Sequence, residues 1–407
     1  MPASTGNGLS MRLGLYLEAL AKEFRTDLVV IPVSGNMSSS ADLPQRLGIS
    51  PLVLEVEGHR DTQFELLIRL KDPSARIAAF RDYGRSSLAA GVSAAILETL
   101  RRRIGTTQYD LVHIGRAYLA DALTAVGNFR VATLDLDEDE NTSRQEMAAR
   151  LRSEGRLFEA EWALAEAAAE QRLISASVGS FDRFFVSSAA DALSIAEIHP
   201  DLRLEVVENS VAVPEHPRRQ DNGNTLLFVG SFGYFPNVDA MNWFIEMIWP
   251  QVRSAVPQAR LLVVGRDVPA ALVAVNGRDG VEVRGPVAEI DSAYVEATLA
   301  IAPLRSGAGT RIKLIEAAAQ NVPIVSTSLG ARGLGLTSPD KLWLADNAGS
   351  FAGAIVEALA DPSERFARAA RAREYVAAHH DRSRNAEALA GRFASMLSTA
   401  GGSGGLN

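Results

Sequence analysis

Two charged residues one helical turn apart, Lys313 and Glu316, follow a short loop of small residues, and this combination suits a phosphorylated ligand. The loop, Ser306-Gly307-Ala308-Gly309-Thr310, carries little side-chain bulk, so its backbone N–H groups can approach a ligand closely. A helix that starts near Thr310 adds a partial positive charge at its N-terminus. Lys313 would then lie beside phosphates and Glu316 would reach ribose hydroxyls, as in a nucleotide-sugar site. On these residues alone, an ordinary strand–helix–strand unit with a solvated Lys–Glu pair is an equally good interpretation.

The elements on either side of this loop indicate a buried strand–loop–helix–strand unit. Leu299 to Leu304 is an apolar run of strand length, and Arg311 to Gln320 repeats apolar residues at helical spacing. Asn321 and Pro323 end that helix, and Ile324 to Thr327 is the next strand. The loop therefore lies at the carboxyl end of a strand in a parallel sheet.

Composition indicates a soluble globular protein, with 47% hydrophobic and 22% charged residues among 407. A net charge of −8 argues against nucleic acid as a partner, and the lack of cysteine excludes disulfides, thiol catalysis and thiolate zinc sites. No apolar run reaches the roughly 18–20 residues that span a bilayer, and the first residues, MPASTGNGLSMR, lack the apolar core of a signal peptide. We expect a cytoplasmic protein, with peripheral contact at the inner face of the membrane as an open alternative.

Strands alternate with helices in both halves of the chain, which predicts an α/β protein of two doubly wound domains. In the first half we expect strands over 28–33, 51–57, 109–114, 130–136, 181–187 and 204–209, and helices over 10–24, 86–103 and, as one long stretch, 141–175. In the second half we expect strands over 225–230, 259–265, 281–284, 299–304, 324–327 and 342–344, and helices over 238–256, 311–320, 350–360, 364–378 and 385–397.

The domain boundaries follow from this pattern. Residues 1–208 form an N-terminal Rossmann-like domain, 209–224 a linker rich in proline and charge, and 225–384 a C-terminal Rossmann-like domain. Residues 385–407 form a terminal helix, expected to pack back on the N-terminal domain, and a flexible tail. A glycine turn such as Gly6-Asn7-Gly8 normally follows a strand, and none precedes it here, so we expect either that the natural chain starts further upstream or that the N-terminal domain lacks its first strand.

The second half resembles a known family. Five segments resemble the C-terminal half of glycosyltransferase family 4 in their order and spacing: FVGSFGYFPNVDAMNWF, LLVVGR, VRGPV, IAPLRSGAGTRIKLIEAAAQNVPIVST and GARGL. More narrowly, they resemble a bacterial subset of this family that carries the motif PLR-x-G-x-GTR-x-K-x-x-EA. The resemblance is strong over residues 225–380, moderate over 6–35 and 109–140, and slight over 40–105. It implies the GT-B fold, with two Rossmann-like domains facing across a cleft, a nucleotide-sugar donor held by the C-terminal half, retention of configuration, and no metal or other cofactor.

The resemblance also implies roles for residues of the C-terminal half. The family has two glutamates separated by seven residues; the second matches Glu316, implied to hold the ribose hydroxyls, and the first falls on Ala308, which leaves the donor sugar open. The loop Gly230-Ser231-Phe232-Gly233 lacks the cations that the family often has there, so Lys313 is the first candidate to replace them and Arg311 the second. Further donor contacts are expected from Gly230, Ser231, Arg266, the loop Gly285-Pro286-Val287 beside the nucleobase, and the amides of Gly307, Ala308, Gly309 and Thr310.

The N-terminal half is expected to bind the acceptor. Gly6, Asn7 and Gly8 would face the donor, His113 loosely matches a family histidine at a strand end, and Arg116 is the nearest charged residue at that edge. A histidine that ends a buried strand is more often structural, and that interpretation stays open for His113.

Two further patterns have plainer explanations. Asp135-Leu136-Asp137 looks like the DxD motif of metal-dependent glycosyltransferases, but contact with the acceptor is a better interpretation than a metal site, and an acidic strand-to-helix loop is the plain one. Residues 60–103 hold nine Lys or Arg against five Asp or Glu, which suits an anionic membrane or lipid-linked acceptor, although solvated helix faces are the usual explanation.

We therefore predict a glycosyltransferase that moves a sugar from a nucleotide-diphospho-sugar to an acceptor hydroxyl on a glycan, a lipid-linked molecule or a small molecule, with retention and without metal. Two other classes stay open. A non-catalytic GT-B partner or scaffold protein would suit Ala308 and the missing first strand. A GT-B nucleotide-sugar epimerase would need acid and base carboxylates in the N-terminal half.

Overall fold

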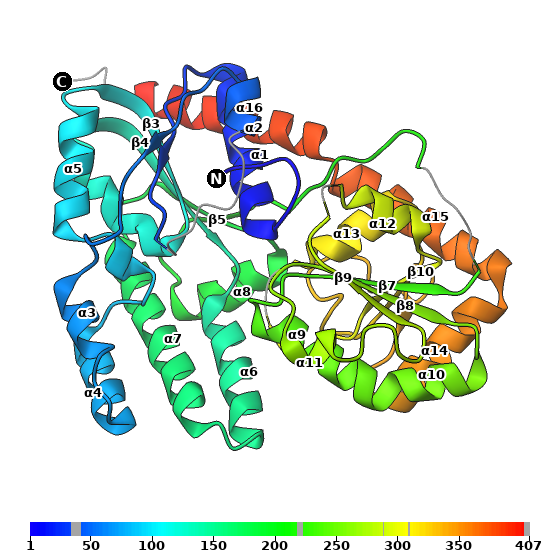
Figure 1. Cartoon of the computed structure of the whole chain (residues 1–407). Coiled ribbons are helices and arrows are strands. Elements are labelled where there is room, and N and C mark those ends of the chain that lie inside the picture. The colour runs from blue at the N-terminus through cyan, green and yellow to red at the C-terminus, as the bar shows by residue number, and fades with distance from the viewer. Residues whose placement is uncertain (34–41, 218–222, 288, 308–309, 403–407) are drawn as a thin grey trace. The chain divides into compact units, whose positions relative to one another are not determined.

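The computed structural model describes residues 1–33, 42–217, 223–287, 289–307 and 310–402, and its elements belong to two compact units. The first unit comprises Met1–Ala3, Arg12–Glu208 and Ala386–Asn407, and the second comprises Ser4–Met11 and Asn209–Asn385. Two helices, α1 (Gly8–Glu23) and α16 (Arg382–Gly402), carry residues of both units (Figure 1).

The first unit contains a four-stranded parallel sheet in the order β3-β4-β5-β6 and a separate parallel pair, β1 and β2. The strands are β1 (Val29–Val30), β2 (Leu52–Val53), β3 (Gln108–Gly115), β4 (Asn128–Asp137), β5 (Arg183–Val186) and β6 (Leu204–Val206). The helices after α1 are α2 (Asp42–Arg46), α3 (Thr62–Leu67), α4 (Pro73–Tyr83), α5 (Ala94–Ile104), α6 (Glu140–Ser153), α7 (Leu157–Ser177) and α8 (Ala189–Ile198). Short 3₁₀ turns cover Ala89–Gly91 and Ala117–Ala125. No strand precedes α1 in the part of the chain described.

Helices pack on both faces of the larger sheet of this unit. On one face Tyr16 of α1 and Phe185 of β5 meet Phe393 of α16, whose ring contacts that of Phe185 edge-on at a centroid distance of 5.9 Å. On the other face Leu134 and Phe184 pack in a cluster with residues of α7 and α8. A parallel sheet covered in this way needs apolar residues on both faces, which explains the apolar run Phe184-Phe185-Val186 of β5.

Four expectations for the first unit need correction. The long helix over 141–175 is two helices, because Gly155 adopts a left-handed conformation with φ +76° between α6 and α7. The helix expected over 86–103 begins at Ala94, where Ser93 accepts a capping hydrogen bond from the backbone of Ile96. The strands expected over 28–33 and 51–57 pair through only two residues each. Among the described residues of this unit, four helices, α2, α3, α4 and α8, lie where no element was expected.

The second unit contains a six-stranded parallel sheet in the order β12-β11-β10-β7-β8-β9. Its strands are β7 (Thr225–Val229), β8 (Arg260–Val264), β9 (Val281–Arg284), β10 (Leu299–Ala302), β11 (Ile324–Ser326) and β12 (Trp343–Leu344). Its helices are α9 (Phe235–Trp243), α10 (Trp249–Ala255), α11 (Ala270–Val273), α12 (Asp291–Glu296), α13 (Ile312–Ala319), α14 (Ala348–Ala360) and α15 (Pro362–His379). A π-helical turn, Phe244–Ile248, joins α9 to α10, so the single helix expected over 238–256 is interrupted.

Alternate residues along the strands of this sheet belong to two separate hydrophobic cores, one on each face. Leu226, Phe228 and Leu261 point to the face covered by α9, α10 and α14, whereas Leu227 and Leu262 point to the face covered by α12, α13 and α15. This alternation follows from the two-residue period of a strand. It places α9 and α13, the helices after β7 and β10, on opposite faces.

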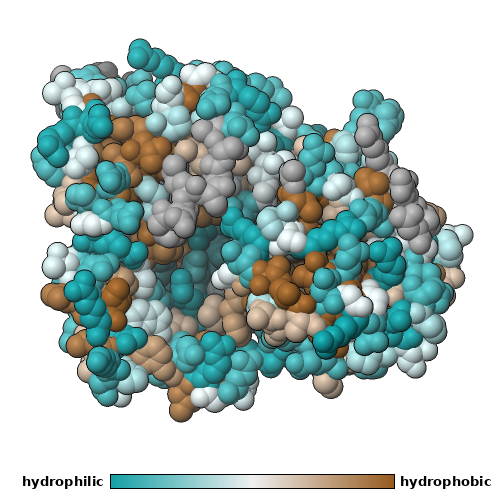
Figure 2. All heavy atoms as spheres, viewed as in Figure 1, coloured by the Kyte–Doolittle hydropathy of each residue, from teal (hydrophilic) through white to brown (hydrophobic). Residues whose placement is uncertain are grey.

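Polar and apolar side chains are interspersed on the face of the molecule shown in Figure 2. Among the described residues, the three most exposed large apolar side chains lie on three different helices: Leu193 at 70%, Leu157 at 64% and Leu66 at 61%. None of the helices within the described ranges is long and apolar enough to cross a membrane.

Candidate functional site

The sheet of the second unit changes direction between its neighbouring strands β7 and β10. From β7 the chain continues through α9 to β8 on one side, and from β10 it continues through α13 to β11 on the other. Because α9 and α13 cover opposite faces, the loops that leave these two strands diverge at the carboxyl edge of the sheet. Open α/β sheets bind their ligands at such a switch point.

The loop after β7 meets the end of β8 backbone to backbone. A Cβ on Gly265 would lie 1.7 Å from the carbonyl oxygen of Gly230, and a Cβ on Gly230 would lie 2.9 Å from Cγ of Asn237. Asn237 donates from Nδ2 to the carbonyl oxygen of Ser231 over 2.8 Å. The conformation of this loop therefore depends on glycine at both strand ends and on one amide side chain of α9.

The loop after β10 is tight at Gly307. This residue has φ +107°, a conformation that favours glycine, and a Cβ there would lie 2.8 Å from the hydroxyl of Tyr234. Arg311 is only 9% exposed and donates from Nη2 to the carbonyl oxygen of Gly307 over 2.5 Å. Arg311 thus stabilises the loop itself.

The end of this loop leads directly into α13. Thr310 accepts a hydrogen bond at Oγ1 from Nδ2 of Asn209 over 2.5 Å. The helix begins at Ile312, slightly later than the expected start near Thr310. Ala308 and Gly309, two predicted donor-binding residues, lie outside the described residues.

Lys313 carries its ammonium group to the switch point. Its Nζ donates a 2.8 Å hydrogen bond to Oδ1 of Asn237 and lies 4.0 Å from the ring centroid of Phe228. Burial, with a smaller contribution from the charge of Arg311, lowers the pKa of Lys313 to about 7. A cation in this environment gains strongly from a bound polyanion, since the anion replaces the solvation that burial removes.

Glu316 lies one turn further along α13 and has a different neighbour. Its Oε2 accepts a 2.9 Å hydrogen bond from the hydroxyl of Tyr294, on α12. Burial raises the pKa of Glu316 to about 7, against the opposing effect of the hydrogen bond from Tyr294. A partly buried carboxylate of this kind is stabilised by hydroxyl donors, and the ribose of a nucleotide offers two.

Two more predicted donor residues lie on neighbouring loops. Arg266 follows β8, and its Nε donates to Oγ of Ser231 over 3.2 Å, which links the loops after β7 and β8. Gly285, Pro286 and Val287 follow β9, whose last residue, Arg284, forms two 2.9 Å hydrogen bonds to the carboxylate of Glu296 on α12. An ion pair between Arg284 and Glu296 therefore joins α12 to the strand residue directly before the predicted nucleobase loop.

Sequence reasoning missed three residues of this site: Phe228, Asn237 and Tyr294. Each contacts Lys313 or Glu316 although it is distant along the chain. Asn237 had a usable signal, because it is a polar residue near the start of the helix that follows a strand and a glycine loop. Phe228 and Tyr294 look like ordinary core residues, and no pattern distinguishes them.

The residues predicted to face the donor from the N-terminal half are divided between the two units. Gly6, Asn7 and Gly8 group with the second unit, where a Cβ on Gly8 would lie 3.2 Å from Cδ1 of Ile312. Asn7 accepts a 2.9 Å hydrogen bond at Oδ1 from the backbone of Ser10, and thereby caps α1. This loop adjoins the first residue of α13 within one unit.

His113 and Arg116 remain in the first unit. His113 stacks on Tyr16 at a centroid distance of 4.1 Å and bonds Thr133 Oγ1 through Nδ1 over 2.9 Å. Burial lowers the pKa of His113 to about 3, so the ring is neutral at physiological pH. Arg116, at φ +131°, pairs with Asp137 over 2.5 Å and with Glu140 over 2.7 Å.

The acidic pair Asp135 and Asp137 is engaged by arginine. Asp135 is fully buried, and its two oxygens accept hydrogen bonds from Nε and Nη2 of Arg12 over 2.8 and 2.6 Å. Asp137 lies 3.3 Å from Arg12 Nε and also binds Arg116. This arrangement is a buried ion-pair network at the carboxyl edge of the first sheet.

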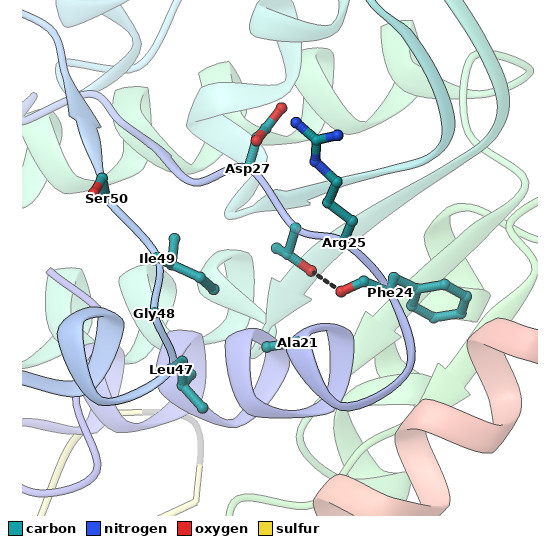
Figure 3. Close-up of a pocket in the computed structure, with 9 residues that line it drawn as sticks. Ala21, Phe24, Arg25, Asp27, Leu47, Gly48, Ile49 and Ser50 are labelled. Atoms are coloured by element: carbon teal, nitrogen blue, oxygen red, sulfur yellow. Dashed lines mark hydrogen bonds between the residues drawn. The ribbon is translucent and has the colours of Figure 1, made fainter.

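A shallow pocket of about 420 Å³ lies elsewhere in the first unit (Figure 3). It is formed by the C-terminal end of α1 and the chain after α2, and its lining residues are Ala21, Phe24, Arg25, Thr26, Asp27, Leu47, Gly48, Ile49 and Ser50. It contains none of the predicted site residues. Its lining includes the polar side chains of Arg25, Thr26, Asp27 and Ser50, of which Thr26 donates to the carbonyl of Phe24 and Asp27 accepts from Tyr109.

Comparison of the sequence with known proteins identifies relatives of the second unit. Residues 223–361 match the family model described as "Glycosyl transferases group 1". An uncharacterised 44.6 kDa protein from the cps region of Klebsiella pneumoniae is 25% identical over 153 residues, which is 35% of this chain and 39% of that protein. The match therefore spans well under half of either protein.

Comparison of the structure identifies similar folds along the whole chain. Sucrose-phosphate synthase from Thermosynechococcus elongatus superposes with a TM-score of 0.66 at 14% identity, over 97% of this chain and 94% of that one. Anabaena HepE in complex with UDP-glucose superposes with a TM-score of 0.60 at 12% identity, over 97% of this chain and 98% of that one. Staphylococcus aureus TarM gives 0.60 at 11% identity, with 74% of this chain covering 58% of TarM. The predicted fold class is thus confirmed: the protein has the α/β GT-B fold of glycosyltransferases, with two Rossmann-like units.

Proposed function

We propose that this protein is a glycosyltransferase that moves a sugar from a nucleotide-diphospho-sugar to an acceptor hydroxyl. The observation that carries the proposal is the position of Lys313 at the switch point of the second sheet. Its ammonium lies against Phe228 and Asn237, one helical turn before Glu316, inside the segment that matches the group 1 model. Sites of this kind suit a diphosphate joined to a ribose.

In the proposed reaction the second unit binds the donor. As the bond from the sugar to the diphosphate breaks, negative charge grows on the leaving phosphate oxygens. Lys313 would stabilise that charge with little rearrangement, because its hydrogen bond to Asn237 already orients the ammonium. We propose that backbone amides of the loop after β10 add to this effect. Glu316 would accept hydrogen bonds from ribose hydroxyls and fix the nucleoside.

Lys313 would bind the diphosphate in its protonated form. Since burial lowers its pKa to about 7, proton uptake at Lys313 would accompany binding at and above neutral pH. The contact would then be a charge-assisted hydrogen bond. We propose that the site needs no metal, since Lys313 and the loop amides would together supply the positive potential, and that transfer proceeds with retention, as the sequence resemblance implies.

The choice of donor and acceptor has narrower support. HepE was solved with UDP-glucose, and TarM with UDP and alpha-GlcNAc-glycerol. On that basis we propose a uridine diphosphate sugar as the first donor to test and a sugar-containing acceptor. We assign acceptor binding to the first unit.

The first experiment is a thermal-shift screen of the full chain against UDP, GDP, dTDP, ADP and their common sugars. A ligand that binds only the native state raises the unfolding temperature with concentration. One nucleotide family should give a shift, and EDTA should leave that shift unchanged. A metal-dependent shift would contradict the metal-free proposal.

Activity is then measured as donor hydrolysis and as transfer to candidate acceptors, with product configuration determined by NMR. Lys313→Met should weaken nucleotide binding by about 10–100-fold and slow turnover by about 10²–10³-fold. Lys341→Met is the matched control, since the ammonium of Lys341 faces Asp340 and Tyr375 in the same unit. Unchanged donor turnover in both Lys313→Met and Glu316→Gln would overturn the proposal.

A further inference from the structure

Helix α12 places a buried hydroxyl directly against the carboxylate of Glu316. Tyr294 is 1% exposed, and its hydroxyl lies 2.9 Å from Oε2 of Glu316 and 3.1 Å from the carbonyl oxygen of Lys313. The same phenol therefore contacts both residues that the proposed function assigns to the donor. Tyr294 reaches them from a helix that precedes β10, 22 positions before Glu316.

The phenol has one hydrogen and faces two acceptors, so it cannot fully satisfy both at once. Burial and the neighbouring charge of Glu316 raise the pKa of Tyr294 well above its ordinary value, so the hydroxyl keeps its hydrogen at working pH. When Glu316 is ionised, the hydrogen is attracted to the carboxylate, because a charged acceptor forms the stronger bond. When Glu316 is protonated, its own hydrogen can go to the phenol oxygen, and the phenol turns to the carbonyl of Lys313.

The helix that carries Tyr294 is fixed at its far end. Glu296 receives two 2.9 Å hydrogen bonds from Arg284, and Arg284 also donates to Glu282 over 2.6 Å. These contacts join α12 to the end of β9. Tyr294 therefore projects from a helix that is bonded to the sheet, which suits a residue that must hold another side chain in place.

We propose that Tyr294 is the positioning residue for Glu316: its hydroxyl occupies Oε2 and directs the rest of the carboxylate toward two ribose hydroxyls. The inference rests on the proposed function of the site, and it identifies the ribose as the part of the donor that Glu316 and Tyr294 recognise. Tyr294 would thereby determine how well the site distinguishes a ribonucleotide from an analogue without the ribose hydroxyls. In this role Tyr294 would act on the donor only through Glu316.

The test compares a nucleoside diphosphate that binds in the thermal-shift screen with its 2′,3′-dideoxy analogue, by calorimetry. In the wild-type chain the ribonucleotide should bind more tightly. Tyr294→Phe keeps the ring and removes the hydroxyl, so the ratio of the two dissociation constants should fall about tenfold while dideoxy binding stays within about twofold. Tyr83→Phe, a buried tyrosine of the first unit, is the matched control and should leave the ratio unchanged.

A pH series separates positioning from packing. The charged and titratable groups that act on Glu316 are Tyr294, Asp291 and Lys313. Because the bond from Tyr294 lowers the pKa of Glu316, Tyr294→Phe should move the acidic limb of ribonucleotide binding to higher pH. A merely structural residue would weaken both nucleotides alike and leave that limb in place.

The double variant gives the decisive comparison. In a Glu316→Gln background, Tyr294→Phe should change the ratio no further, since the residue acts through the carboxylate. An unchanged ratio in Tyr294→Phe, with a reduced ratio in Glu316→Gln, would overturn the inference and leave the proposed function standing. An unchanged ratio in both variants would overturn the inference together with the ribose role of Glu316, and a wild-type chain that binds no nucleotide would overturn the proposed function itself.

Discussion

The ammonium of Lys313 donates a 2.8 Å hydrogen bond to Oδ1 of Asn237, although the two residues are 76 positions apart. Lys313 belongs to the helix after β10 and Asn237 to the helix after β7, so this bond spans the switch point of the second sheet. The other end of the same amide holds the carbonyl oxygen of Ser231 over 2.8 Å. One buried side chain therefore aligns the cation with the first loop of the site.

Removing this amide should weaken the site without removing the cation. We expect Asn237→Ala to reduce nucleotide affinity by about 3–10-fold, the value of one ordinary net hydrogen bond, because Asn237 acts on the diphosphate only through Lys313. Asn237→Asp should reduce it further, because a carboxylate at this position raises the pKa of Lys313 but repels a diphosphate. Calorimetry measures both, and Asn276→Ala, which loses only a bond to the backbone of Val283, is the control. Tighter binding by Asn237→Asp would contradict a diphosphate at Lys313.

Without ligand, burial of Lys313 should destabilise the protein most below about pH 7, and burial of Glu316 should destabilise it most above about pH 7. The folded-state pKa of Lys313 is lowered from 10.5 to about 7, so the folded chain binds fewer protons than the unfolded chain between these values, and stability rises with pH there. The pKa of Glu316 is raised from 4.5 to about 7, so stability falls as the pH rises from 4.5 to 7.

Two neutral variants should reveal this effect. Without ligand at pH 7, Lys313→Met and Glu316→Gln should each raise the melting temperature, by about 2–4 °C for each kcal/mol regained. The gain from Lys313→Met should disappear as the pH rises toward 10.5, and the gain from Glu316→Gln as the pH falls toward 4.5. Calorimetric melting across this range is the measurement, and gains that do not vary with pH would count against the two shifted pKa values.

Gly265 should tolerate no side chain. A Cβ there would lie 1.7 Å from the carbonyl oxygen of Gly230, so Gly265→Ala must separate the ends of β7 and β8. We expect a loss of about 3 kcal/mol or more and a strong loss of nucleotide binding. Gly353, in the middle of α14, has open space within 4 Å of the position that a Cβ would take, and Gly353→Ala should stabilise the helix by about 1 kcal/mol. Urea unfolding of both variants tests the contrast.

The ion pair between Arg12 and Asp135 should be costly to break and cheaper to replace. Arg12 is 1% exposed and Asp135 is fully buried, so Arg12→Met leaves an uncompensated carboxylate in the first unit. We expect a loss of about 3–5 kcal/mol from Arg12→Met alone. Arg12→Met combined with Asp135→Leu should recover most of that loss, because both charges are removed together. A double variant no more stable than Arg12→Met would contradict this expectation, and the difference between the double variant and the wild type measures the net contribution of the pair.

Local pattern predicted the second unit better than the first, for a physical reason. Strands buried on both faces of a parallel sheet leave unbroken apolar runs, and β7 to β12 were each expected within about two residues of their observed ends. In the first unit, the apolar runs over 28–33 and 51–57 pair through two residues each, because pairing depends on the neighbouring strand as well as on the run. The break at Gly155 lies among strong helix formers, so only the left-handed conformation of that one residue reveals it.

Spacing along the chain was enough to specify the candidate chemistry: a glycine loop before a helix, with Lys313 and Glu316 one turn apart. What these two side chains touch depends on the folded arrangement. Asn237 and Phe228 reach Lys313 because β7 and β10 are neighbours in the sheet although their helices diverge, and Tyr294 reaches Glu316 because α12 packs on the same face as α13. Such contacts join residues 22 to 85 positions apart, and the pKa values of both charged groups follow from the burial that those contacts create, which no local pattern encodes.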